Sequence, residues 1–182
     1  GIFESIPQSS SMLVRTINGV SASLSTSGLA PDTAHTVWWL VFNNPEACTG
    51  GEQGTELQCL PPGDIGDPAV NASVFGGAGQ VTDLYGRATF SAFAFTGEDN
   101  GLTLLRGPGI VDPFKAEIHL IVEDHGPAGR LVDAGLLEEA MRYQFVGCRA
   151  FDTDGDGEAD EFEPNFGLCL GNIQGTAHVP VP

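Results

Sequence analysis

The sequence has little positive charge. Seven Lys and Arg residues stand against 24 Asp and Glu residues in a chain of 182, which gives a formal net charge of -17 at pH 7. A surface of that sign repels the phosphates of nucleic acids and of anionic lipids. The chain also lacks an uninterrupted apolar run of about 18 residues, which a transmembrane helix requires. These absences exclude nucleic acid as a partner and predict no membrane span.

Cysteine is scarce as well, with four residues and no C-x-x-C spacing, which disfavours a zinc site. We expect two local disulfides, Cys48 with Cys59 and Cys148 with Cys169, although four cysteines allow three connectivities. Disulfides form in oxidising compartments. The sequence begins at Gly1 rather than Met, which fits a mature form after removal of a signal peptide. We therefore predict a secreted protein, extracellular or at the cell surface.

Motifs for catalysis are missing too. The sequence contains no G-x-S-x-G nucleophile turn, no H-E-x-x-H zinc helix and no internal repeat. This favours a non-enzymatic protein without deciding the matter.

The residues that are present favour β-structure. In residues 20–25, Val20, Ala22 and Leu24 alternate with serines, which is typical of a half-buried strand. Residues 35–42 are apolar on both faces and predict a central strand. About seven or eight such segments, separated by Gly and Pro, predict a mostly antiparallel β-sandwich, immunoglobulin-like or jelly-roll-like. One short helix is expected in residues 131–143, where apolar residues recur at helical spacing.

Two glycine- and aromatic-rich segments give more local predictions. Residues 76–79 predict a turn because three of the four are glycine. Phe90, Phe93 and Phe95 change parity, so we expect either a β-bulge or a strand buried on both faces. Trp38 and Trp39 are adjacent and must point to opposite faces of a strand, so at least one should lie in the core.

The N-terminal residues 1–11 predict an arm ahead of a single domain at residues 12–182. Ile2, Phe3 and Ile6 precede Pro7 and a run of serines. Such a segment docks on its own domain or adds a strand to a neighbouring subunit.

The most specific pattern in the chain is an acidic stretch at residues 152–163. Its register puts a glycine, Gly157, at position 6 of a twelve-residue loop, where a calcium loop turns sharply. The acidic residues that we expect to bind calcium are Asp152, Asp154, Asp156, Glu158, Asp160 and Glu163. Pro164 follows at once, so a second helix of an EF-hand is not expected. The pattern predicts a static calcium brace at the C-terminal end of the domain.

A second metal site is suggested by residues 116–125. Alternation predicts that His119 and His125 share one strand face with Glu117 and Glu123. Six residues of straight strand span about 20 Å, too far for one ion, so a site needs a third ligand. His178, in a strand expected at residues 173–179, is the candidate. The alternative is that these histidines face solvent or form ordinary hydrogen bonds.

The acidic loop resembles the calcium loops of thrombospondin type 3 repeats and dockerins, over residues 152–163 alone. In those families such loops act structurally and in adhesion or assembly. Elsewhere, V-W-W-L-V-F-N-N-P-E-A-C at residues 37–48 and A-E-I-H-L-I-V-E-D-H-G-P at residues 116–127 resemble uncharacterised secreted bacterial β-sandwich proteins. That resemblance implies no activity.

Together these features predict a secreted, calcium-stabilised structural or adhesive module. Its expected partners are further copies of itself or another extracellular protein, in an assembly such as a filament in which the arm pairs as a strand. Two alternatives stay open. One is a metalloenzyme with a site at His119, His125 and His178. The other is a calcium-dependent carbohydrate-binding module that uses Tyr85 or an exposed tryptophan.

Overall fold

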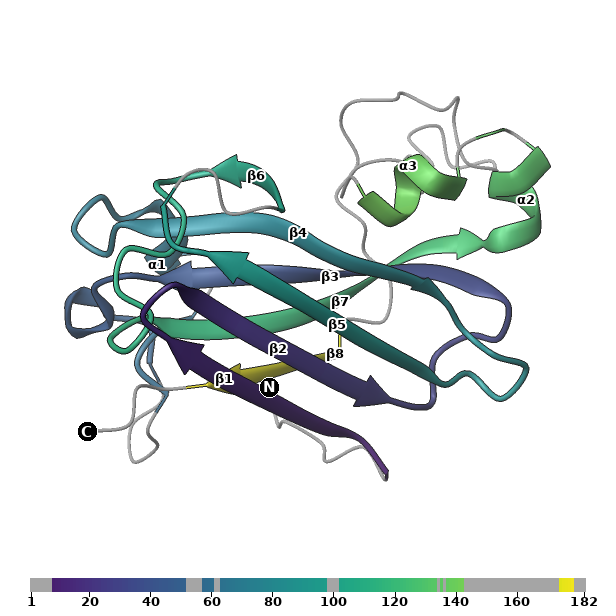
Figure 1. The fold of residues 1–182 in the computed structure, drawn as a ribbon, viewed down its shortest axis with the longest axis horizontal. Helices are drawn as coiled ribbons and strands as arrows, with labels where there is room; N and C mark the ends of the chain where they lie inside the picture. The colour runs from purple at the N-terminus through teal and green to yellow at the C-terminus, as the bar shows by residue number, and fades with distance from the viewer. Residues whose placement is uncertain are drawn as a thin grey trace.

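The computed structural model describes residues 8–51, 57–60, 63–97, 102–133, 135, 137–142 and 174–178. It is mostly β, as the sequence predicts, with two antiparallel sheets (Figure 1). The first sheet has the order β1-β2-β5, with β1 at Ser10–Thr16, β2 at Gly19–Thr26 and β5 at Ala88–Phe95. The second has the order β6-β4-β3-β7-β8, with strands Thr103–Arg106, Ala72–Val81, Thr33–Phe42, Glu117–Pro127 and Gln174–His178.

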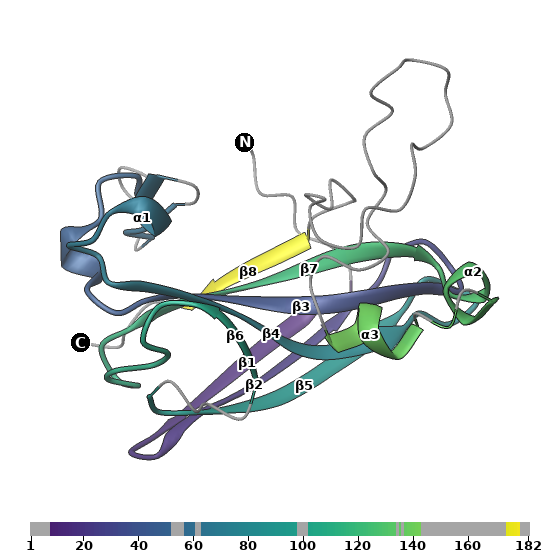
Figure 2. The same cartoon turned by 90° about the horizontal axis from the view of Figure 1, so that it is seen from above.

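The two sheets share one hydrophobic core, because alternate residues of each point toward the other sheet. Val20, Ala22 and Leu24 of β2 are buried there, as predicted, and meet Trp39 and its neighbours from the second sheet. The buried residues of this cluster are Val20, Ala22, Leu24, Leu29, Val37, Trp39, Val41, Phe75, Ala88, Phe90, Ala94, Ile110, Ala116, Ile118, Leu120 and Val122. Figure 2 shows the layers in profile.

A second, smaller core lies on the other side of β3 and β7. Leu40 and Phe42 pack there with Cys59, Val70 and Ala72. The segment that covers this side contains the 3-10 helix η1 at Pro45–Ala47 and the helix α1 at Gly63–Gly66 (Figure 2). The expectation that β3 is a central strand buried on both faces is confirmed.

The expected turn at residues 76–79 is wrong. β4 runs straight through these glycines from Ala72 to Val81. They are needed for close packing rather than for turning, since a Cβ on Gly77 would lie 2.5 Å from the indole Nε1 of Trp39.

The expected helix at residues 131–143 is also corrected. Two short helices take its place, α2 at Ala128–Asp133 and α3 at Leu137–Arg142. Gly135 lies between them with a φ of 71°, a left-handed conformation that ends a helix. Leu131 still packs inward, with Ala34, Leu137 and Met141.

The parity change in β5 has a third explanation, which the sequence did not suggest. β5 pairs with β2 without a register shift from Ala88 to Phe95. Phe90 points into the core, whereas Phe93 and Phe95 point outward and are exposed. No bulge is needed, and the outer face of this strand is not buried.

Several predictions fall outside the described residues. These are residues 1–7 of the arm predicted at residues 1–11, the calcium loop at residues 152–163, and the pair Cys148 and Cys169. The last two residues of the predicted arm, Ser10 and Ser11, are already part of β1. The predicted C-terminal strand is present as β8, Gln174–His178. None of the helices in the described ranges is long and apolar enough to cross a membrane.

Candidate functional site

The candidate site is the side of β7 that carries its polar residues. In the antiparallel register, Glu117 pairs with Phe42, His119 with Leu40 and Glu123 with Thr36, so these side chains lie on the sheet face away from the main core. The shared face is as predicted, but it does not face solvent. The exposed fractions are 0% for Glu117, 7% for His119, 5% for Glu123 and 2% for His125.

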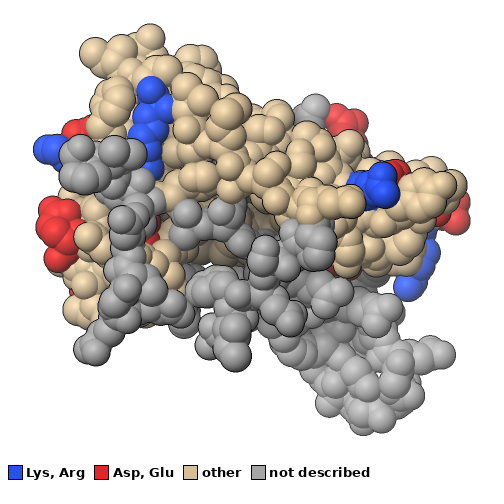
Figure 3. Space-filling model, turned by 90° about the horizontal axis from the view of Figure 1, so that it is seen from below, with Lys and Arg blue, Asp and Glu red and all other residues tan. Residues whose placement is uncertain are grey.

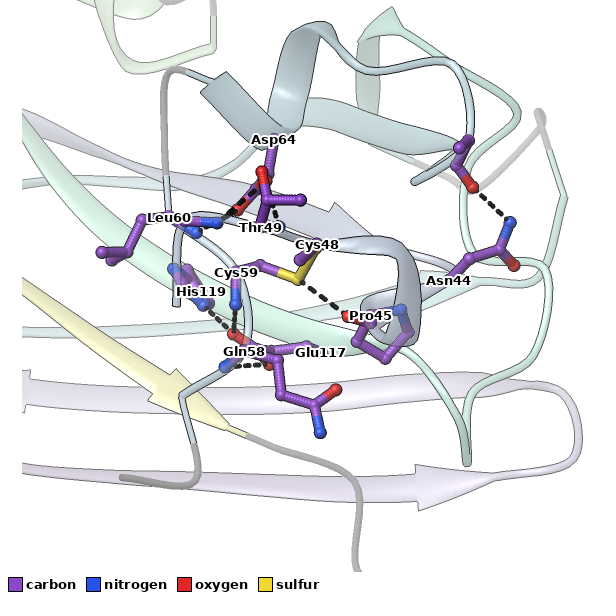
Figure 4. The surroundings of a disulfide bond; sticks show 12 residues. Asn44, Pro45, Cys48, Thr49, Gln58, Cys59, Leu60, Asp64, Glu117 and His119 are labelled. Carbon is purple, nitrogen blue, oxygen red and sulfur yellow. Dashed lines mark hydrogen bonds and ion pairs between the residues drawn. A yellow bond between two sulfur atoms is a disulfide. The ribbon is translucent and has the colours of Figure 1, made fainter. Parts of the chain in front are cut away.

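Glu117 is the centre of one half of this face (Figure 4). Its Oε1 accepts hydrogen bonds from the backbone N–H of Cys59 at 3.1 Å and from Nε2 of His119 at 2.7 Å. Its Oε2 accepts the backbone N–H of Gln58 at 3.1 Å. A buried carboxylate is stable only with such donors. Glu117 therefore holds the segment around Cys59 against the sheet.

The same segment is closed by the disulfide between Cys48 and Cys59, which confirms the first predicted pair. Cys59 is fully buried, and its sulfur lies 3.9 Å from the carbonyl oxygen of Pro45. The disulfide and Glu117 thus act on one loop from two sides (Figure 4).

Asp64 completes this arrangement from α1. Its carboxylate is buried and accepts the backbone N–H groups of Thr49, Gly50 and Leu60, the shortest bond being 2.7 Å to Leu60. Burial alone would raise the pKa of Asp64, but the N–H donors of Leu60, Thr49 and Gly50 together outweigh it and hold the pKa below its ordinary value. This carboxylate is therefore a structural anion.

The other half of the face contains Glu123 and His125. His125 Nε2 lies 2.8 Å from the hydroxyl of Thr36, and both residues are buried. Within the described ranges, Oε2 of Glu123 has no hydrogen-bond partner. Burial, and secondarily the neighbouring charge of Asp124, raises the pKa of Glu123 to about 7. A hydroxyl beside an imidazole is a nucleophile–base arrangement in principle, but here both side chains are buried.

The three histidines proposed as a metal site are not on one face. β8 pairs with β7 so that His178 is opposite Ile118, a core residue, while Ala177 is opposite His119. Residues paired in an antiparallel ladder share a face, so His178 and His119 lie on opposite faces. His119 and His125 are each committed to a different partner, Glu117 and Thr36.

Across the described ranges, the single group of three potential metal ligands is Cys48, Cys59 and Asp64. Both sulfurs of that group are joined in the disulfide and are not available as thiolates. The described residues therefore offer no assembled transition-metal site.

One residue that sequence reasoning missed is Arg15. Its guanidinium donates to the backbone oxygens of Ala116 at 2.8 Å and His178 at 3.2 Å, and also to that of Pro113. Arg15 belongs to β1 in the first sheet, whereas His178 belongs to β8 in the second. Burial lowers the pKa of Arg15, which still leaves it a cation that joins the two sheets. The sequence did contain a signal for this role, because Arg15 is the single charged residue of β1.

Searches against family models, curated proteins and solved structures find no match to this chain. The site must therefore be interpreted from its geometry. Glu117 and Asp64 accept backbone N–H groups, and the imidazoles of His119 and His125 are hydrogen-bonded. These contacts stabilise the fold, whereas Oε2 of Glu123 is buried without a partner among the described residues.

Proposed function

We propose that this chain is a secreted, non-enzymatic β-sandwich module, immunoglobulin-like or jelly-roll-like, that serves a structural or adhesive role in an extracellular or cell-surface assembly. The observation that carries the proposal is the hydrogen bonding of Glu117. All the hydrogen bonds described for its carboxylate come from His119 and from the disulfide-closed loop. The buried polar groups thus support the fold rather than a reaction. The disulfide also supports an oxidising location.

Calcium is the second part of the proposal and rests on the sequence of residues 152–163. With several carboxylates in one loop, calcium would neutralise part of the net charge of -17 and brace the C-terminal region that leads into β8. The loop would act as a static support, since the proline after it leaves no outgoing helix to move.

The calcium part is tested by titrating the purified full chain with Ca²⁺ while following heat release and the melting temperature. We expect one bound ion and a higher melting temperature, with both lost in Asp154→Asn. Glu46→Gln is the matched control, because it removes the same charge at an exposed position elsewhere. A melting temperature that does not change on addition of calcium would overturn the proposal of a calcium site.

The assembly part is tested by sedimentation and by electron microscopy of the native particle, with the full chain and with a chain lacking residues 1–7. The deletion stops there because β1 already begins at Ser10, and Ser9 bonds the hydroxyl of Thr26 at 3.1 Å. We expect ordered oligomers that depend on these residues. A monomer at every concentration and calcium level would contradict an assembly role.

A further inference from the structure

The outer face of the β1-β2-β5 sheet carries no charged side chain. Four residues from each strand form it, in rows across the sheet. They are Ser10, Met12, Val14 and Thr16 from β1, Gly19, Ser21, Ser23 and Ser25 from β2, and Thr89, Ser91, Phe93 and Phe95 from β5. In a chain with 31 charged side chains, 7 basic and 24 acidic, a three-stranded face without one is a distinct surface.

The side chains on this face differ in size from strand to strand. Its middle strand, β2, presents only small side chains, whereas large apolar side chains stand on both sides. Met12 and Val14 are 61% and 46% exposed on β1, and Phe93 and Phe95 are 36% and 51% exposed on β5. We call this lower row of small side chains on β2 the β2 groove. It runs from Ser25 to Ser21, and at Gly19 the ring of Phe93 lies over it, since a Cβ there would be 3.0 Å from Cε1 of Phe93.

Contacts with β5 limit the size of the side chains on β2. At Gly19 an added Cβ would lie 2.1 Å from the carbonyl oxygen of Ala94, so no larger residue fits. Further along, the hydroxyls of Ser25 and Thr89 bond each other at 3.1 Å. The floor hydroxyls are thus partly satisfied within the sheet, which lowers the cost of covering them.

The wall on β5 is a ridge. Phe93 and Phe95 pack edge to face with their ring centroids 4.9 Å apart. Such a pair behaves as one raised apolar body. The face therefore offers both a ridge and a groove, one strand spacing apart.

We propose that this face is the surface through which two copies of the chain pack, related by a two-fold axis that runs along the strands between β2 and β5. That axis places the Phe93 and Phe95 ridge of each copy over the β2 groove of the other, which is the self-complementarity that an isologous interface needs. The proposal goes beyond the assembly role above, because it uses neither calcium nor residues 1–7.

The absence of charged side chains on this face favours a second copy of the chain as its partner. Two chains of net charge -17 repel each other over most of their surfaces, so they approach best through uncharged ones. Figure 3, which looks at the edge of this sheet rather than onto its face, shows the charged side chains of the described residues gathered toward the two ends of the molecule. An acidic or basic partner would find no complementary charge on this face.

The size of the face sets the strength of the contact. The proposed axis lays β2 and β5 of one copy over β5 and β2 of the other, so eight of the twelve positions meet. At about 4.8 Å between strands and about 6.7 Å between alternate residues, they cover roughly 260 Å² per copy. That is about a third of the ~800 Å² per partner in a standard interface. The dimer should therefore be weak, with a Kd of about 10 μM to 1 mM.

The experiment is sedimentation equilibrium of the full chain in EDTA, over a concentration range that reaches about 1 mM. We expect a monomer–dimer equilibrium that tightens at least about threefold between low and high NaCl, because salt shortens the Debye length from about 10 Å at 0.1 M to about 3 Å at 1 M and screens the repulsion. An interface built on ion pairs would weaken instead, and that result would overturn the proposal.

Two variants test the surface. Phe95→Ser removes the ridge without adding charge, and Ser23→Asp places a carboxylate on the floor; each should weaken dimerisation at least about tenfold. Tyr85→Ser and Tyr85→Asp are the matched controls, since Tyr85 is 75% exposed in the turn between β4 and β5, off this face. Dimerisation unchanged in both face variants, or lost equally in the controls, would refute the proposal.

A further arm separates other occupants. If the chain lacking residues 1–7 no longer dimerises, those residues rather than the sheet face make the contact, and the proposal falls. If the full chain is monomeric in EDTA at 1 M NaCl while a neutral oligosaccharide shifts the amide signals of Ser21 and Ser23, the face binds carbohydrate and the dimer is wrong. Calcium-dependent assembly through the arm can fail or succeed independently of these results.

Discussion

Cys59 donates its backbone N–H to Oε1 of Glu117 over 3.1 Å, and this bond links a disulfide-closed loop to the first residue of β7. Without this bond, the described part of the loop would keep its covalent bridge, the hydrogen bonds to Asp64 and a small apolar cluster. A buried carboxylate thereby acts as a backbone clamp.

Replacing Glu117 by Gln should therefore destabilise the protein. The amide has one acceptor oxygen, so its NH₂ must face either Gln58 N–H or the pair of donors from Cys59 and His119. A buried donor facing a donor costs about 2–3 kcal/mol of unfolding free energy. Urea unfolding followed by circular dichroism measures it. The exposed control Glu46→Gln should stay within about 0.5 kcal/mol, and an equal midpoint for both variants would refute the clamp.

The clamp and the disulfide should also be coupled. Removing the bridge with Cys48→Ala and Cys59→Ala should cost about 3 kcal/mol, the order expected for a short closed loop. Adding Glu117→Gln to that variant should then cost at least about 0.5 kcal/mol less than it does alone, because the loop is already released. Strict additivity would show that the two restraints act separately.

The sequence predicted the parts of the fold that depend on local periodicity. The alternation of Val20, Ala22 and Leu24 identified the core face of β2, and the apolar run at residues 35–42 identified β3. It also placed Glu117 and His119 on one face, since neighbours two apart on a strand share a side.

Periodicity could not predict which segment of the chain covers the polar face of β7. The Glu117 end of the polar face of β7 is covered by residues 57–60, and this contact joins positions 58 residues apart. β1 was missed for a similar reason: its outward residues Met12 and Val14 are apolar, so no polar alternation marked it. The glycines of β4 concealed a strand because they meet neighbours from other elements, Trp39 at Gly77 and Met141 at Gly79.

The Arg15 contact leads to a third prediction. Arg15→Met keeps an apolar stem but removes the donors to the backbone oxygens of Pro113, Ala116 and His178. We expect a loss of about 2–3 kcal/mol. Amide exchange in β8 should speed up more than in β2, because β8 loses its link to the first sheet. Arg87→Met is the control. Its guanidinium lies over the exposed Tyr85 ring at 5.3 Å, so its loss should cost below about 1 kcal/mol, and a β8 exchange rate unchanged in Arg15→Met would contradict the link.

The close approach at Gly77 gives a fourth prediction. Gly77→Ala places a methyl group 2.5 Å from Nε1 of Trp39, so the indole or the strand must shift. Overpacking of this kind costs about 1–3 kcal/mol. In contrast, Gly129→Ala in α2 meets nothing within 4 Å and should be neutral or stabilising by up to about 1 kcal/mol. Tryptophan fluorescence should report the shift in the first variant alone, and matching unfolding curves for the two variants would disprove the packing argument.

The last prediction concerns pH and Glu123. Burial raises the pKa of this carboxyl to about 7, against about 4.3 in an unfolded chain. Between these values the folded state holds more protons than the unfolded state, so this group's contribution to stability is full below about pH 4.3 and is lost as the pH rises to about 7.

Glu123→Gln should remove that dependence. The variant should match the parent near pH 4 and exceed its stability by about 1–2 kcal/mol at pH 8, a value reduced to allow for solvent screening. Comparing parent and variant at each pH cancels the opposite trend from His35, whose pKa burial lowers and Asp124 partly restores. Carboxyl ¹³C NMR should give Glu123 a midpoint near 7, and a midpoint near 4.3 with parallel stability profiles would show that Glu123 is solvated, because only a desolvated carboxylate resists ionisation at neutral pH.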